Sequence, residues 1–173
     1  LTAGVCFTGS VAVAKIIHRA LAAKDGPITP LMAETGGINA MIVDPTALPE
    51  QVVDAVVQSA FRSAGQRCSA LRLLCVHEGI ADKVIDMIQG AVQELALGDP
   101  AELSTDVGPV IDREAFDNIQ NHLQRLDSTS KVLPALAGHA QTAPDSIANL
   151  VLPSAFEVAS LAGVKDEIFG PVL

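Results

Sequence analysis

One cysteine of this 173-residue chain lies among residues that suit nucleophilic chemistry. Cys68 is flanked by small and polar side chains in the run 65–70, which reads GQRCSA, so a substrate has room to approach the sulfur. The neighbouring Arg67 is expected to favour the thiolate, which is the nucleophilic form of the side chain. A buried, inert thiol is the commoner state of a free cysteine. Cys6 and Cys75 fit that description, because each lies in an apolar, β-prone run, whereas Cys68 fits it poorly.

A carboxylate and a strand-to-helix junction are the other candidate sites. Glu34 lies between a β-prone run and the pair Gly36-Gly37, where the backbone can be approached closely, and a partly desolvated carboxylate there can act as a general base. Gly9 and Ser10 lie where a strand gives way to a helix, and free amides at a helix N-terminus attract anions. Each feature also has a simpler interpretation, with Glu34 as a solvated loop acid and Ser10 as a helix N-cap.

Metal binding and histidine-assisted hydrolysis have weaker support. Cys68, Cys75 and His77 form a C-x6-C-x-H pattern that matches no common zinc spacing, so no metal site is predicted. A cofactor-independent cysteine hydrolase that uses Cys68 with a base such as His77 stays open, although nothing in the sequence places a histidine as the base. The four histidines do not cluster along the chain; they are His18, His77, His122 and His139.

Strands alternate with helices along the chain, which predicts an α/β fold with a largely parallel sheet. The β-prone runs cover residues 5–8, 28–32, 40–43, 71–76, 131–137 and 149–152. Apolar residues at helical spacing follow Ser10, Pro49, Ile80 and Asp112, and Gly98 is expected to end the third of these helices. The candidate residues therefore lie at the ends of these elements, where backbone groups and side chains can meet a ligand.

The composition excludes several classes of protein. Apolar residues make up 49% and charged residues 18%, against about 25% charged in a typical soluble domain, so the chain is not disordered and has apolar surface that is normally covered. Its apolar runs fall short of the roughly 18 residues of a membrane-spanning helix, and residues 1–14 lack the basic start of a signal peptide. The net charge of −9 argues against nucleic acid as a partner. Three cysteines without a disulfide spacing favour a cytoplasmic protein.

Four motifs stand in the order and approximate spacing of the aldehyde dehydrogenase superfamily, which the chain resembles over its whole length. They are FTGS at 7–10, ETGGINA at 34–40, GQRC at 65–68 and EIFGPV at 167–172. Residues 31–76 look most like the L-glutamate γ-semialdehyde (Δ1-pyrroline-5-carboxylate) dehydrogenases of the bacterial proline utilization A family. Many other relatives have Leu where Thr35 stands and Lys near Ile38, and this difference supports the narrower resemblance.

The resemblance implies a role for each candidate residue. Cys68 corresponds to the nucleophile that attacks the aldehyde carbon, and Glu34 to the base that activates water to hydrolyse the resulting thioester. The implied reaction is the NAD-dependent oxidation of L-glutamate γ-semialdehyde to glutamate. Ser69 resembles a position that contacts the substrate carboxylate. The positions that match the NAD site are Gly9, Ser10, Thr35, Gly36, Glu167 and Phe169.

The resemblance also implies that the chain is part of a longer enzyme. Residues 1–33 correspond to the end of a Rossmann-like cofactor domain, and residues 34–173 to most of an α/β catalytic domain that is incomplete at its C-terminus. The parent is expected to form a homo-oligomer and, in this subfamily, to be fused to a proline dehydrogenase domain. A dehydrogenase of another aldehyde with NAD or NADP and a catalytically silent structural fragment stay open as alternatives.

The 173-residue chain by itself is expected to show no dehydrogenase activity, because the resemblance places half of the oxyanion hole and most of the cofactor site outside it. NADH absorbance, followed with purified chain, NAD and glutamate semialdehyde, should stay at background. Robust NAD reduction would contradict the expectation.

Overall fold

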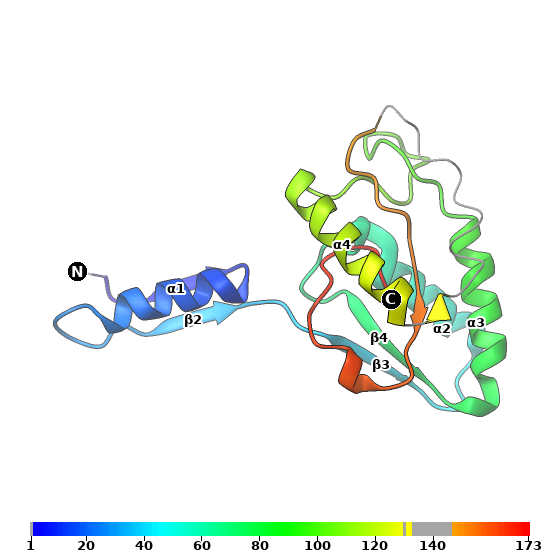
Figure 1. Ribbon diagram of the computed structural model, residues 1–173, viewed down its shortest axis with the longest axis horizontal. Helices are drawn as coiled ribbons and strands as arrows, with labels where there is room; N and C mark the ends of the chain where they lie inside the picture. The colour runs from blue at the N-terminus through cyan, green and yellow to red at the C-terminus, as the bar shows by residue number, and fades with distance from the viewer. Residues whose placement is uncertain (1, 130, 133–146) are drawn as a thin grey trace. The chain divides into compact units, whose positions relative to one another are not determined.

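A computed structural model describes residues 2–129, 131–132 and 147–173 of the chain (Figure 1). The chain divides into two compact units, Leu1–Gly37 and Ile38–Leu173. This division falls a few residues after the boundary expected between residues 33 and 34. The assignment of the two parts to a cofactor domain and a catalytic domain stays a prediction.

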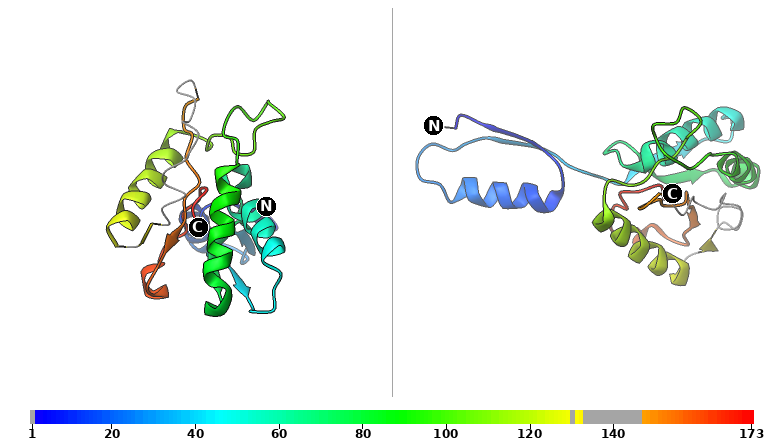
Figure 2. Two further views of the ribbon diagram at one scale, coloured as in Figure 1. Left: turned by 90° about the vertical axis from the view of Figure 1, so that its right-hand side faces the viewer. Right: turned by 90° about the horizontal axis from the view of Figure 1, so that it is seen from above.

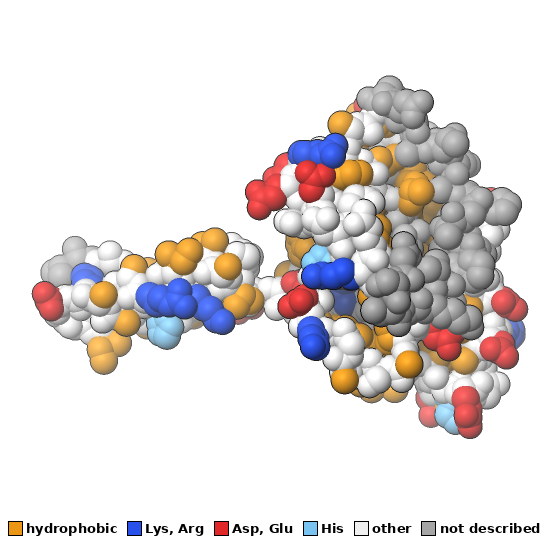
Figure 3. Space-filling view, in the orientation of Figure 1, with side chains coloured by type: hydrophobic (Ala, Val, Ile, Leu, Met, Phe, Trp, Pro, Cys, Tyr) orange, Lys and Arg blue, Asp and Glu red, His pale blue; other side chains and the backbone are white. Residues whose placement is uncertain are grey.

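The first unit is a β-α-β motif. Strand β1 (Val5–Thr8) precedes helix α1 (Val11–Ala22), and strand β2 (Leu31–Glu34) pairs with β1 in parallel. Of the residues of α1, Ala14 alone is buried. Apolar side chains lie on the surface of this unit, drawn in orange in Figure 3. The large exposed ones are Val11, Val13, Ile16, Ile28 and Met32. Part of the high apolar content of the chain is therefore exposed on the surface of this unit.

The second unit contains the remaining elements. Its parallel strands are β3 (Asn39–Val43) and β4 (Leu71–Val76), and its antiparallel strands are β5 (Lys131–Val132) and β6 (Phe156–Glu157). Its α-helices are α2 (Pro49–Val56), α3 (Glu78–Gln93) and α4 (Arg113–Thr129). Helix α2 continues as a π-helical turn (Val57–Phe61) and a 3-10 turn (Arg62–Gly65), and a further 3-10 turn spans Leu161–Gly163.

The core of the second unit lies where α2 and α3 pack together beside the β3–β4 pair. Helix α4 lies on one side of the segment that carries β6, and α3 lies on the other (Figures 1 and 2). Large apolar side chains from all of these parts close the core; the most deeply buried are Phe61, Ile88, Val56, Val84, Val107 and Val151. Burial of each such side chain contributes about 1.5–3 kcal/mol, which makes this core the main source of stability.

The expected α/β alternation is observed, and two of the three described strand pairs are parallel. Strands form within or close to the runs expected at 5–8, 28–32, 40–43 and 71–76, and helices follow Ser10 and Pro49 as predicted. The third helix, expected from Ile80, begins at Glu78. The fourth follows Asp112, whose Oδ1 accepts a hydrogen bond from the Ala115 backbone N–H at 2.8 Å.

Two expectations about local structure were wrong. Residues 149–152 do not form a strand, because Asn149 has a left-handed backbone (φ 63°) in a turn, and regular pairing starts only later, at β6. Gly98 does not end α3, which has Glu94 as its C-cap; the Gly98 N–H instead donates to the Val107 carbonyl. Of the strand expected at 131–137, the first two residues are β5 and residues 133–137 lie outside the described part of the chain.

Gly65→Ala is expected to lower the free energy of unfolding by about 3 kcal/mol, since a left-handed alanine and an overpacked contact each cost about 1–3 kcal/mol. Gly65 has φ +62°, and a Cβ there would meet the carbonyl oxygen of Gly170 and lie 2.6 Å from that of Ala60. Gly90→Ala is the matched control, because Gly90 lies within α3 with open space around it and should gain about 0.5–1 kcal/mol. Urea unfolding of both variants measures the difference, and equal midpoints would contradict it.

Candidate active site

Cys68 lies in a tight, exposed turn between the 3-10 turn that ends at Gly65 and the start of β4. We call residues 65–70 the thiol loop. The turn is closed by the Ala70 N–H, which donates to the Arg67 carbonyl at 3.0 Å. Ser69 is also exposed, beside the thiol. The sulfur is thus a free, accessible thiol on a short loop, as nucleophilic chemistry requires.

Asn39, the first residue of β3, holds this loop from the neighbouring strand. Its Nδ2 donates to the carbonyl oxygens of Cys68 at 2.8 Å and Ala70 at 3.0 Å. One amide group therefore satisfies both carbonyls that flank Ser69. These bonds leave the Cys68 side chain unused, so they fix the backbone of the candidate nucleophile without covering its sulfur.

Arg67 connects the thiol loop to the helical turn that precedes it. Its Nη2 donates to the carbonyl oxygens of Gln58 at 2.7 Å and Ser59 at 3.2 Å, in the π-helical turn that follows α2. Arg67 therefore has a structural role in addition to its predicted effect on the thiolate, which stays a prediction. A wide π turn leaves carbonyls without regular helical partners, and the guanidinium supplies donors for them.

Gln66 joins the thiol loop to the segment at residues 167–171, which we call the EIFGP segment. The Gln66 Nε2 donates to the Phe169 carbonyl at 3.3 Å, and its Oε1 accepts from the Ile111 N–H at 2.9 Å. The Phe169 side chain is 43% exposed, so it is available for contact with a ligand. Glu167 has a buried Oε1 without a hydrogen-bond partner. An orphaned carboxylate oxygen of this kind can accept a hydrogen bond from a ligand hydroxyl.

Arg72 joins the same two segments from inside the protein. It is 8% exposed, its Nη1 donates to the Gly170 carbonyl at 2.7 Å and its Nη2 donates to the Gly65 carbonyl. Burial lowers the pKa of Arg72, the charge of Glu167 raises it and the like charge of Arg67 lowers it. The direction that prevails is downward, because removing a guanidinium from water disfavours its charged form.

The remaining candidates lie in the first unit, at the carboxyl ends of its two strands. Glu34 is the exposed last residue of β2, and its carbonyl oxygen accepts a hydrogen bond from the Gly9 N–H at 3.1 Å. Ser10 is the N-cap of α1, since its Oγ accepts from the Val13 N–H at 3.3 Å. Thr35 is half-buried and Gly36 is exposed directly after β2. The parallel pairing thus brings the FTGS and ETGG motifs together.

His77 does not act with Cys68. It follows β4, whereas Cys68 precedes it, and a six-residue strand separates its ends by about 20 Å. The His77 Nδ1 accepts a hydrogen bond from the Gly79 N–H at 3.1 Å and so caps α3. This position excludes His77 as the base for Cys68. The described residues contain no cluster of three or more metal-ligating side chains, and His139 lies outside them.

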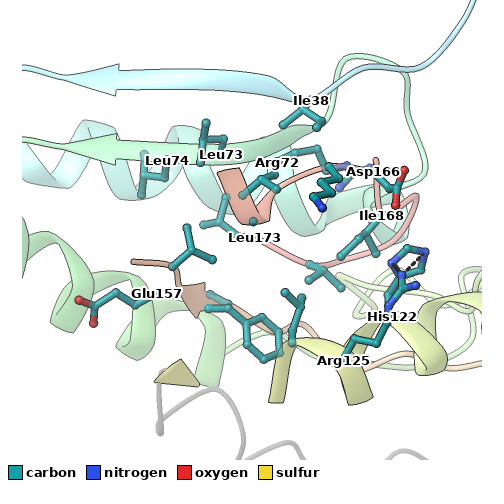
Figure 4. A pocket seen from close by; sticks show the side chains of 18 of the residues that line it. Ile38, Arg72, Leu73, Leu74, His122, Arg125, Glu157, Asp166, Ile168 and Leu173 are labelled. Carbon is teal, nitrogen blue, oxygen red and sulfur yellow. Dashed lines mark hydrogen bonds between the residues drawn. The ribbon is translucent and has the colours of Figure 1, made fainter. Parts of the chain in front are cut away.

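A cavity of about 780 Å³ lies between β4, α4 and the C-terminal residues (Figure 4). None of the catalytic or cofactor residues expected from the sequence lines it, and its floor is apolar, with Leu73, Leu74 and Ile88. At its edge, burial lowers the pKa of His122, and the charge of Arg125 acts in the same direction. Arg72 lines this cavity and also bonds to the thiol loop and the EIFGP segment.

Comparison with known proteins assigns the family. The sequence profile of the aldehyde dehydrogenase family matches residues 2–173. The chain belongs to the aldehyde dehydrogenase family. It is 48% identical to the bifunctional protein PutA of Klebsiella aerogenes over 98% of the chain, although it spans only 13% of that relative.

Two solved structures of this aldehyde dehydrogenase family share the fold of the chain closely. A mutant of proline utilization A from Bradyrhizobium japonicum matches with a TM-score of 0.90 and 55% identity, over 98% of this chain and 17% of that one. A 1-pyrroline-5-carboxylate dehydrogenase from Thermus with bound NAD matches with a TM-score of 0.86 and 28% identity, over 98% of this chain and 33% of that one.

Three residues that hold the aldehyde dehydrogenase motifs together were not predicted as site residues. Asn39 and Gln66 lay inside motifs and could have been suspected, since a polar amide beside a candidate nucleophile often fixes its loop. Arg72 carried a stronger signal, because a lone charged residue inside an otherwise apolar strand must find partners when it is buried.

Asn39→Asp is expected to lower the free energy of unfolding by about 2 kcal/mol or more, since it replaces the donor to two carbonyls with a third acceptor. Asn118→Asp is the control, because Asn118 is exposed on α4 and the same change there should be nearly neutral. Urea unfolding near neutral pH, where both introduced carboxyl groups are expected to be ionised, gives the comparison. Equal changes in the free energy of unfolding would contradict a stabilising role for the two hydrogen bonds of Asn39.

Proposed function

We propose that the protein carrying this chain oxidises L-glutamate γ-semialdehyde to glutamate, with NAD as the oxidant. The observation that carries the proposal is an exposed thiol, Cys68, on a loop fixed by the surrounding motifs, in a chain that resembles proline utilization A and 1-pyrroline-5-carboxylate dehydrogenases over 98% of its length. The names of these relatives connect the reaction to proline catabolism.

Cys68 acts as the nucleophile in this proposal. Its thiolate attacks the aldehyde carbon, and the oxygen of the thiohemiacetal accepts a hydrogen bond from the Cys68 backbone N–H. Because Asn39 fixes the Cys68 carbonyl at 2.8 Å, the peptide groups around the sulfur hold one orientation during the attack. Once the adduct has lost a hydride, a thioester joins Cys68 to the substrate, and Glu34 removes a proton from the water that hydrolyses it.

The residues present fit a dinucleotide. The orphaned, buried Oε1 of Glu167 is suited to accept a ribose hydroxyl, and the exposed Phe169 offers an apolar face beside it. Thr35 and Gly36 would lie near the nicotinamide, and Gly9 and Ser10 at the start of α1 near the pyrophosphate. The chemistry that NAD supplies when bound is acceptance of a hydride at the nicotinamide ring.

Ser69 provides the substrate preference in this proposal. Its hydroxyl is exposed next to Cys68, and glutamate semialdehyde carries a carboxylate that such a hydroxyl can bind. An aldehyde without that carboxylate would lose this contact. Comparison of glutamate semialdehyde with a simple aliphatic aldehyde of similar length therefore separates the proposed substrate from the broader class of aldehydes.

The proposal extends to the setting of the whole protein. We infer a fused proline dehydrogenase domain, because the related PutA proteins are named bifunctional and are several times longer than this chain. The homo-oligomer stays a prediction from the family resemblance. A cytoplasmic location accords with three cysteines that are all free thiols. No helix among the described residues is long and apolar enough to cross a membrane.

Cys68→Ser in the full-length protein is expected to abolish NADH formation, since a serine hydroxyl at this position lacks a base to activate it. Cys6→Ser removes another exposed thiol, in β1, and should leave the rate unchanged. NADH absorbance with glutamate semialdehyde measures both variants. Activity that survives in Cys68→Ser would refute the assignment of the nucleophile.

Glu34→Gln is expected to lower turnover by a factor of roughly 10²–10⁴, the contribution of a general base, while acylation of Cys68 continues. Intact-protein mass spectrometry after mixing with NAD and substrate should then show the acyl adduct on the cysteine. Full turnover without an adduct would show that another group activates the water.

A further inference from the structure

We propose that Arg72 is a positioning residue that couples the thiol loop to the EIFGP segment, so that the nucleophile and the cofactor-facing residues are set by one buried guanidinium. The proposal rests on the proposed function for its kinetic consequences. Its geometric basis is independent of that function, because it concerns only contacts within the second unit.

The two contacts of Arg72 fall on backbone groups that define both segments. The Gly65 carbonyl is at the start of the thiol loop, and the Gly170 carbonyl follows Phe169 in the EIFGP segment. The two glycines approach closely, since a Cβ on Gly65 would meet the Gly170 carbonyl oxygen. A planar guanidinium presents donors in a fixed fork, so it can hold two carbonyls at a set separation in a way that a single ammonium cannot.

The electrostatic surroundings connect Arg72 to Glu167. The carboxylate of Glu167 is close enough to raise the pKa of Arg72, and its buried Oε1 has no hydrogen-bond partner. The Arg72 Nε is likewise buried without a partner. The guanidinium and this carboxylate are therefore close enough to attract each other, while no hydrogen bond takes up the oxygen that a ligand would use.

Gln66 makes a second, weaker tie between the same segments. Its Nε2 donates to the Phe169 carbonyl at 3.3 Å, and this bond is exposed to solvent. Gln66 is half-buried and Arg72 is buried, so the EIFGP segment is held by one exposed and one buried contact. Arg72 is expected to dominate, since its bonds are charge-assisted and shielded from water.

The test uses the full-length protein with Arg72→Met and Arg72→Lys. Iodoacetamide labelling of Cys68, quantified on the peptide that contains it, measures how the loop presents the thiol. The KM for NAD and kcat measure the cofactor side. We expect Arg72→Met to slow labelling by about tenfold and to raise the KM for NAD by about tenfold, because misplacement of a reactive group by less than 1 Å has effects of this order. Arg72→Lys should fall between Arg72→Met and the parent, which would show partial rescue.

Arg113→Met is the matched control. It also removes a guanidinium from the second unit, but that group is exposed at the start of α4, and its partners among the described residues are its neighbours Asp117 and Phe116. Labelling and KM should match those of the parent. A loss of the same size in Arg113→Met would show a general effect of charge removal and overturn the proposal.

The outcomes separate positioning from mere stability. If Arg72→Met lowers the unfolding midpoint but the folded protein labels at the parental rate with a parental KM, Arg72 is only structural and the proposal fails. If Arg72→Met does not fold, Arg72→Lys decides, and parental labelling and KM in that variant overturn the proposal. Labelling needs neither NAD nor substrate, so it tests Arg72 even if wild-type protein fails to oxidise glutamate semialdehyde, which would refute the proposed function alone.

Discussion

The buried guanidinium of Arg72 is the interaction on which the arrangement around Cys68 depends. Arg72 is 8% exposed, and burial of a guanidinium is costly unless its N–H groups find hydrogen-bond acceptors. Its Nη1 and Nη2 donate to the carbonyls of Gly170 and Gly65. Gly65 ends a 3-10 turn and Gly170 lies outside the strands and helices, so local turns alone would otherwise set the positions of these carbonyls. Because Arg72 bonds to both carbonyls, it fixes the thiol loop relative to the EIFGP segment. Gly65 must be glycine, since a Cβ there would meet the Gly170 carbonyl oxygen.

Short-range signals in the sequence predicted most of the secondary structure. Pro49 begins α2, Asp112 caps α4 and Ser10 caps α1, because each of these effects is decided within a few residues. The errors arose where a distant contact or a single backbone angle decided the outcome. At Asn149 a left-handed conformation replaces the expected strand, and Asn tolerates that conformation better than most residues.

The motifs predict the chemistry of the candidate site, and the roles of Cys68, Glu34 and the residues expected around NAD stay predictions. They do not predict the hydrogen bonds that assemble the second unit, several of which link residues 29 to 103 positions apart. Periodicity and capping rules carry no information on such pairs. One such contact could have been predicted from the sequence. Arg72 is the single charged residue in an apolar strand, and a buried charged group needs hydrogen-bond partners.

A nucleophilic loop has to meet two opposed requirements, because the sulfur must be open to substrate while the backbone that carries it must not move. In this chain the side chains of Asn39, Gln66, Arg67 and Arg72 all bond to backbone groups, mostly carbonyls, and the Cys68 thiol is free and exposed. Bonds to the backbone restrict the loop without occupying its reactive atom, and donors from several elements hold it more firmly than a turn alone. Left-handed backbone at Ser63 and Ala64, just before the loop, accords with this view, since such conformations persist only where the surrounding structure holds them in place.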